Sequence, residues 1–172
     1  MFQDQCNSVA DLSSSERVCS RVNCADDLIT PELRSLYQLW QERRGDRIAP
    51  ARADFDVPEL VPWLPHIMLS DYLDDGADAR FRVIGTWIVD QYGKDNSGKT
   101  ASAVDFHGRS QQILSEYKHV AKTMMPHQIC GPFFKHTGTQ DFREAERLLL
   151  PLSKDGRTCD KLLTAVYFLS SY

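Results

Sequence analysis

The feature that most constrains the fold of this chain is the grouping of strand-like segments on either side of a helical region. Two runs come first and are joined by the turn sequence Asp74-Asp75-Gly76. Three more follow the longest helical segment. The five runs are residues 66–73, 80–86, 127–135, 142–152 and 159–169. Because helices and single strands do not alternate in a βαβ pattern, this order predicts an α+β fold with an antiparallel sheet.

The longest predicted helix runs from Arg109 to Met125 and ends at Pro126. Its apolar side chains recur at helical spacing and gather on one side of the helix: Ile113, Leu114, Tyr117, Val120, Ala121 and Met124. Pro132 and Pro151 fall inside predicted strands, where proline cannot donate a hydrogen bond to a neighbouring strand. We expect a bulge or an edge position at these prolines.

A second amphipathic helix is predicted near the N-terminus. Thr30 is a suitable N-cap, Pro31 suits the first turn and Gly45 ends the helix. The apolar stripe of this helix consists of Leu33, Leu36, Tyr37 and Trp40. Such a stripe has to be buried, and two arrangements suit the pattern: packing on the domain's own sheet, or packing against a second copy of the helix.

The segment before this helix is polar, rich in serine and aspartate and without periodicity, which is typical of poorly ordered chain. The expected organisation is a flexible tail over residues 1–28, the amphipathic helix over residues 29–45 and an α+β domain over residues 46–172. A length of 172 residues suits one domain with a short appendage.

The charge balance argues against nucleic acid as a partner, because the chain has a net charge of −4 and nucleic-acid-binding proteins usually carry a basic patch. No apolar run reaches the length of a membrane span, and the N-terminus lacks the apolar core of a signal peptide. We therefore expect a cytoplasmic protein that binds neither nucleic acid nor membrane. The five cysteines are irregularly spaced, so no disulfide framework is predicted.

The sequence carries no catalytic or metal-binding motif. It lacks Gly-x-Ser-x-Gly, and Gly98-Lys99-Thr100 has neither the preceding strand nor the following helix of a phosphate-binding loop. His127 and His136 are nine residues apart, which is not a metal-ligand spacing, so both are expected on the surface. The chain is predicted not to be an enzyme, with no catalytic residues and no metal ligands.

The order of elements and four short stretches together resemble a known family. The stretches are Pro50-Ala51-Arg52-Ala53-Asp54-Phe55-Asp56 with Leu60 and Leu64-Pro65, Phe81-Arg82-Val83-Ile84-Gly85-Thr86, Tyr92-Gly93-Lys94-Asp95 with Gly98-Lys99-Thr100, and Leu148-Leu149-Leu150-Pro151-Leu152-Ser153 with Asp155-Gly156. From about Pro31 onward the chain is similar to PAS domains, and in particular to the stand-alone bacterial PAS family of alphaproteobacteria. The resemblance implies a five-stranded antiparallel sheet with helices on one face, preceded by the N-terminal helix, and a sensory or regulatory role.

PAS domains enclose a small cavity between sheet and helices, and many hold a cofactor or metabolite there. The resemblance places five side chains around such a cavity: Trp87, Tyr92, Leu114, Tyr117 and Met124. A solid core would use the same residues, so a filled interior is the alternative. The sequence leaves the identity of any cofactor open: His119 lies opposite the apolar helix face, which disfavours haem, and no cysteine for a flavin adduct lies between Cys24 and Cys130.

The expected role takes two forms. In the first, the chain is a non-catalytic sensory module that acts through protein–protein contacts and is gated by a small hydrophobic ligand in the cavity. Its homodimer or partner surface is then the helix face of Leu33, Leu36, Tyr37 and Trp40. In the second, the chain is a small-molecule-binding protein or degenerate enzyme whose cavity acts without a partner.

Overall fold

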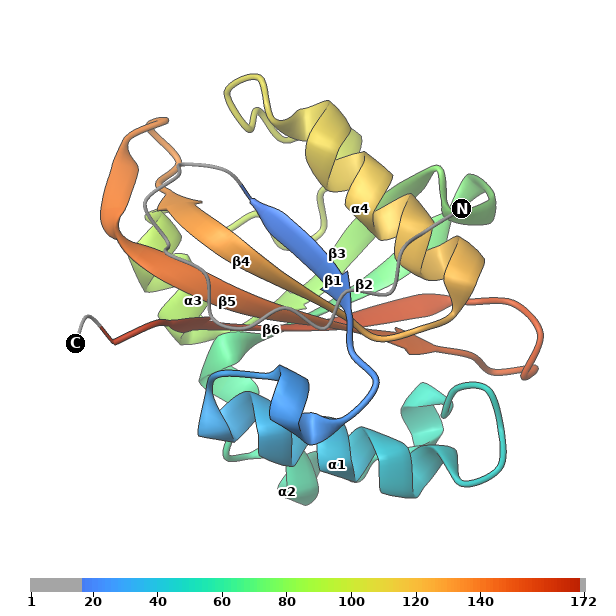
Figure 1. Cartoon of the computed structure of the whole chain (residues 1–172). Helices are drawn as coiled ribbons and strands as arrows, with labels where there is room; N and C mark the ends of the chain where they lie inside the picture. The colour runs from blue at the N-terminus through green and yellow to red at the C-terminus, as the bar shows by residue number, and fades with distance from the viewer. Residues whose placement is uncertain (1–16, 171–172) are drawn as a thin grey trace, which may run out of the picture.

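The computed structural model describes residues 17–170, which form one antiparallel sheet with helices on both faces (Figure 1). The strands are β1 (Val18–Arg21), β2 (Ile67–Leu73), β3 (Asp78–Ile84), β4 (His127–Phe134), β5 (Gln140–Leu152) and β6 (Lys161–Phe168). The helices are α1 (Pro31–Arg44), α2 (Val57–Leu60), α3 (Thr86–Tyr92) and α4 (Ser110–Thr123). Within the described residues the strand order is β1-β4-β5-β6-β2-β3.

The predicted α+β class with an antiparallel sheet is confirmed. Helices α3 and α4 cover one face of the sheet, and the N-terminal helix α1 lies with α2 against the other, as Figure 1 shows for α1 and α4. The described residues form six strands where five were predicted, because β1 pairs along the outer edge of β4. Within the same residues no helix is long and apolar enough to cross a membrane.

Strand β5 is buried on both of its faces, which explains its run of consecutive apolar residues. Leu148 and Leu150 pack in the core beneath α1, whereas Leu149 packs in the core beneath α4. The neighbouring strand β6 divides Leu163 and Leu162 between the same two cores. A strand with one solvated face would alternate apolar and polar residues, so the continuous run marks an interior strand between two layers of helices.

The two strand prolines lie where the sheet tolerates them. The pairing of β4 with β5 shifts its register between Pro132 and Phe134, which is the kind of bulge expected for a strand proline. Pro151 keeps its place opposite Leu162, near the end of β5. The carbonyl oxygen of Pro151 also accepts a hydrogen bond of 2.9 Å from Trp40 Nε1, and this bond holds α1 against the sheet.

The structure corrects the expected extent of the flexible tail. Residues 17–28 contain strand β1 and a 3-10 turn, and Val22 and Leu28 are buried at 2% and 1% exposure. The order comes from pairing with β4, a long-range interaction that the local composition of the segment does not reveal. Residues 1–16 lie outside the described residues.

The four side chains of the α1 stripe are buried within the chain's own core. Leu33 and Leu36 are 0% exposed, Tyr37 is 4% exposed and Trp40 is 2% exposed. They pack against Leu148, Leu150 and Leu152 of β5. The interpretation of this stripe as a dimer or partner surface is therefore wrong, because the sheet of the same chain already covers it.

A buried carboxylate on β5 anchors the start of α1. Glu146 is 0% exposed, and its two oxygens accept hydrogen bonds from the backbone N–H groups of Ile29 at 2.8 Å and Thr30 at 2.7 Å. Gln128 Nε2 donates to the same carboxylate at 2.6 Å. Gln128 Oε1 in turn accepts from the hydroxyl of Ser20 in β1. The carboxylate thus satisfies donors that the N-terminus of a helix leaves unpaired, and it links α1 to the sheet.

Replacing Glu146 with glutamine is expected to lower the free energy of unfolding by about 2 kcal/mol, because a buried backbone N–H then faces an amide in place of a carboxylate oxygen. Urea denaturation measures the change. The control is Glu144→Gln, which alters a half-buried carboxylate of the same strand and is expected to change stability by less than about 0.5 kcal/mol. Equal losses in the two variants would show that Glu146 is not an anchor.

The structure also corrects the expected position of His127. His127 is 4% exposed, whereas His136 is exposed as predicted. Strand β1 and helix α4 cover His127: it lies opposite Arg21, and its Nε2 is 3.1 Å from Nε2 of His119. Its Nδ1 lies 2.8 Å from the carbonyl oxygen of Met125. Burial lowers the pKa of His127, and the nearby His119 and Arg21 lower it further, against the hydrogen bond to Met125.

The lowered pKa of His127 predicts acid destabilisation. Below the ordinary histidine pKa of 6.5, His127 is protonated in the unfolded chain but stays neutral in the folded chain. The free energy of unfolding therefore decreases as the pH falls below that value. His127→Gln is expected to show a smaller loss of unfolding free energy between about pH 7 and pH 5 than the parent protein. An unchanged pH slope in His127→Gln would contradict this assignment.

Candidate functional site

A cavity of about 130 Å³ lies between the sheet and the helices α3 and α4. The central strands β5 and β6 each contribute alternate residues to its wall, because successive side chains of a strand point to opposite faces. The helices and the loop before α4 form the remaining wall. Most of the lining is apolar, and six of its members are Phe81, Ile88, Ile113, Ile129, Leu149 and Val166.

Five charged side chains complete the lining, and four of them are cationic. They are Arg17, Lys94, Arg109, Glu116 and Arg147. Arg17 Nη2 donates to Glu116 Oε2 over 2.7 Å, and the two side chains are only 11% and 10% exposed. Burial raises the pKa of Glu116, and the adjacent Arg17 opposes that rise. This ion pair joins the residue before β1 to helix α4 across the cavity wall.

Arg147 of β5 points to the same face of the sheet as Leu149. Its Nη2 donates to the carbonyl oxygen of Pro132 at 3.0 Å, and its Nη1 lies 3.5 Å from that of Gly131. Within residues 17–170 no carboxylate lies at ion-pair distance from Arg147. Burial, together with the nearby positive charge of Arg17, lowers the pKa of Arg147 to about 9. The guanidinium group is thus held by backbone carbonyl groups in a site that disfavours its charge.

Two polar atoms at the cavity have no hydrogen-bond partner among the described residues. They are the Oγ1 atom of Thr164, a residue of β6 that is 3% exposed, and the Nε atom of Arg17. The Tyr117 hydroxyl lies close enough to the Thr164 side chain to lower the pKa of Tyr117, but burial outweighs this and raises that pKa to about 12, so the hydroxyl stays protonated at neutral pH. The two side chains do not reach hydrogen-bond geometry with each other. Because buried polar groups are nearly always hydrogen-bonded, a water molecule or a ligand in the cavity is expected to pair with these two atoms.

Arg109 lies at the start of α4, with its guanidinium carbon 3.6 Å from the centre of the Phe134 ring. Burial lowers the pKa of Arg109. Stacking on an aromatic face holds the guanidinium plane in place while its N–H groups remain donors. Arg109 and the exposed Lys94 add two positive charges to this end of the cavity.

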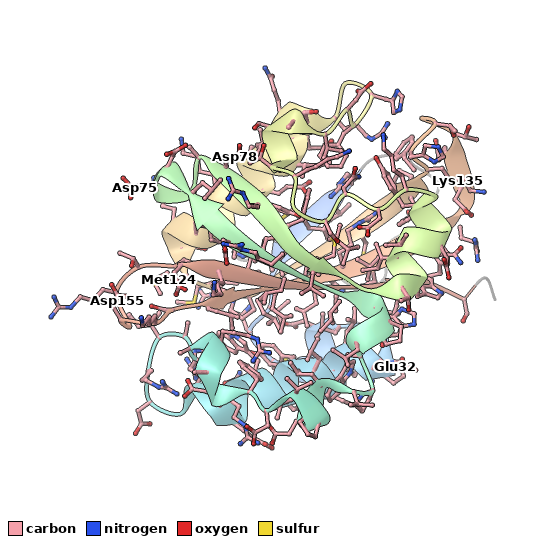
Figure 2. The ribbon with its side chains drawn as sticks, turned by 180° about the vertical axis from the view of Figure 1, so that it is seen from behind. Glu32, Asp75, Asp78, Met124, Lys135 and Asp155 are labelled. Carbon is pink, nitrogen blue, oxygen red and sulfur yellow. The ribbon has the colours of Figure 1, made fainter. Side chains whose placement is uncertain are left out.

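Two of the five residues predicted to bind a ligand line the cavity. Tyr92 and Tyr117 are part of its wall. Trp87 instead stacks on His66, with ring centroids 4.3 Å apart. Leu114 packs at the edge of the core beneath α4, and Met124 is buried in the core on the α1 side. Figure 2 shows Met124 near the hairpin that carries Asp155, at the opposite end of the sheet from Lys135. The assignments of Trp87, Leu114 and Met124 to the cavity are therefore wrong.

Sequence reasoning missed the polar members of the site. Arg147 ends the charged stretch of residues 143–147 and directly precedes the apolar run of β5, so its sequence context does not distinguish it from an exposed residue. Thr164 carries no signal either, because threonine is common in strands. Arg17 belongs to a segment that was predicted to be flexible, so only the pairing of β1 with β4 reveals its place.

Glu116→Gln is expected to lower the free energy of unfolding by about 3 kcal/mol, since it leaves Arg17 buried with no carboxylate partner. Chemical denaturation measures this loss. The matched control is Glu59→Gln, which breaks the more exposed ion pair between Glu59 and Arg43 and is expected to have only a small effect. A loss for Glu116→Gln no greater than that of the control would mean that the cavity tolerates unpaired cations.

The architecture and the site define a class of protein: a small α+β domain built around an internal cavity. A model of the PAS domain family matches residues 29–167, so the chain belongs to the PAS domain family. PAS domains are generally sensory modules, and this membership supports a role in signalling. The match begins after β1, so the strand that carries the N-terminal segment into the sheet lies outside it.

Three solved structures illustrate the similarity in fold. An RNA-binding light-oxygen-voltage receptor is 11% identical with a TM-score of 0.53, and the match covers 90% of this chain and 39% of that one. A light-oxygen-voltage domain studied with a flavin analogue is 9% identical with a TM-score of 0.51, over 67% and 84% of the two chains. The PAS domain of BvgS from Bordetella pertussis is 12% identical with a TM-score of 0.49, over 80% and 88%. No curated protein matches by sequence.

The two light-oxygen-voltage matches, with TM-scores above 0.5, show a shared fold, and the similarity does not extend to a flavin. The cavity volume of about 130 Å³ is below the range of about 300–1,000 Å³ typical for larger ligands, and its described lining contains no cysteine for an adduct. The residues present therefore do not fit a light-oxygen-voltage chromophore.

Proposed function

We propose that the chain is a sensory module in which a small molecule binds in the cavity and the N-terminal segment transmits its presence to a partner protein. The observation that carries this proposal is that Arg17 belongs both to the cavity wall and to the chain segment that continues into β1. The side chain of Arg17 lines the cavity, and its backbone leads directly into β1. A change inside the domain therefore has a short covalent route to the edge of the sheet.

Strand β1 suits the role of a transmitting element. It is held to β4 by four residue pairs, Val18 to Arg21 against Cys130 to His127. All four residues of β1 are exposed, and β1 forms one edge of the sheet. A short edge strand offers unpaired backbone groups to another chain and is also the type of element that detaches most easily. This edge replaces the buried α1 stripe as the proposed surface for a homodimer or a partner protein.

The Arg17–Glu116 ion pair couples the cavity to β1. Arg17 retains an unpaired Nε in addition to its bond with Glu116. A ligand that accepts a hydrogen bond from this Nε adds a contact that exists only while β1 is in place. Ligand binding therefore favours the attached state of β1, by the general rule that a ligand shifts an equilibrium through its differential affinity for two states.

Arg17→Gln is expected to increase the rate of amide hydrogen exchange in residues 18–21 about tenfold or more, because the loss of the ion pair weakens the attachment of β1. Exchange measured by mass spectrometry, with β2 and β6 as internal references, tests this. Arg21→Gln is the matched control, since Arg21 is an exposed residue of the same strand. If the two variants exchange alike, Arg17 does not connect the cavity to β1.

A further inference from the structure

We propose that the ligand of this cavity is a small organic anion, a carboxylate on a compact apolar body, bound through Arg147, Thr164 and Arg17. This inference rests on the proposed function only in taking the cavity as a ligand site. It specifies the chemical class of the ligand.

The charges that line the cavity favour an anion. The lining contains four cationic side chains and one carboxylate, that of Glu116. The cations are Arg17, Lys94, Arg109 and Arg147. Glu116 is already engaged by Arg17 at 2.7 Å. Arg147 has carbonyl oxygens as acceptors but no carboxylate at ion-pair distance within the described residues. Glu116 attracts Arg147 only from beyond ion-pair distance, so a ligand carboxylate would supply a closer counterion for this partly buried cation.

The unpaired atoms specify where the ligand oxygens bind. Thr164 Oγ1 and Arg17 Nε lack partners within the described residues, and both residues line the cavity. In the pairing of β5 with β6, Thr164 lies opposite Leu149 and Arg147 lies opposite Val166, so Arg147 and Thr164 belong to adjacent positions on one face of the sheet. A hydroxyl beside a guanidinium group is a donor set that suits a carboxylate.

The size and the lining of the cavity limit the rest of the ligand. An apolar cavity of about 150 Å³ holds one benzene molecule, and the volume here is about 130 Å³. The rest of the wall is built mostly from aliphatic and aromatic side chains, including Ile88, Ile113 and Phe81. A compact aromatic or branched aliphatic group fills this space with dispersion contacts, whereas a bare inorganic anion would leave the apolar wall empty.

Matched acids and amides test the proposal on the full chain. Benzoate and 3-methylbutanoate carry a carboxylate, and benzamide and 3-methylbutanamide have nearly the same shape without the charge. Isothermal titration calorimetry is expected to show binding of at least one acid at least tenfold tighter than its amide. Thr164→Val, which keeps the side-chain shape, is expected to weaken acid binding about tenfold. Arg147→Met is expected to weaken it further, with the folded state of each variant checked by circular dichroism.

Each other outcome overturns the inference. If the amides bind as tightly as the acids, the ligand site stands but its preference for anions does not. If none of the four compounds binds, or if chloride or inorganic phosphate stabilises the protein as much as the acids do, the organic anion is ruled out. An effect of Thr164→Val equal to that of Ser102→Ala, a change on the exposed surface, would remove the assigned hydroxyl contact. The amide exchange of Arg17→Gln tests the proposed function separately, without any ligand.

Discussion

Two adjacent charged residues in one interior strand organise both halves of this protein. Glu146 and Arg147 follow each other in β5, and the alternation of a strand sends their side chains to opposite faces. On one face Glu146 receives the backbone N–H groups that begin α1. On the other face Arg147 lies at the wall of the cavity. A strand buried on both sides can hold such charges only where specific partners satisfy them, so the surrounding segments are placed to meet that requirement.

The N-terminal segment of residues 17–30 lies close to both Glu146 and Arg147. The backbone N–H of Thr30 donates to Glu146. Ser20 of β1 donates to the side chain of Gln128, which also contacts Glu146. Arg17 lines the cavity close to Arg147. One short stretch of chain thus contacts the Glu146 anchor of α1, forms the edge of the sheet and lines the cavity. This arrangement supports the proposal that the state of the cavity is transmitted through β1, and it places that transmission outside the residues matched by the PAS model.

The sequence predicted the features that depend on local pattern. The α1 stripe, the end of the long helix near Pro126 and the apolar run of β5 all follow from short-range periodicity, and they led to the correct fold class. What it could not predict depends on pairing between distant segments. Strand β1 is polar and takes its structure from β4, and the choice between a dimer surface and a core position for Trp40 depends on the tertiary fold. Similarly, Tyr117 and Met124 share a helical pattern, but the turn after α4 puts Met124 into the opposite core.

The central claim, that an anion in the cavity secures β1 through Arg17, is tested most directly by amide hydrogen exchange of residues 18–21 with and without saturating benzoate. The account predicts that benzoate slows exchange in β1 about tenfold or more, that benzamide leaves it unchanged, and that Arg17→Gln abolishes the response. Exchange in β1 that stays the same when benzoate binds would contradict the coupling, even if the cavity accepts the anion.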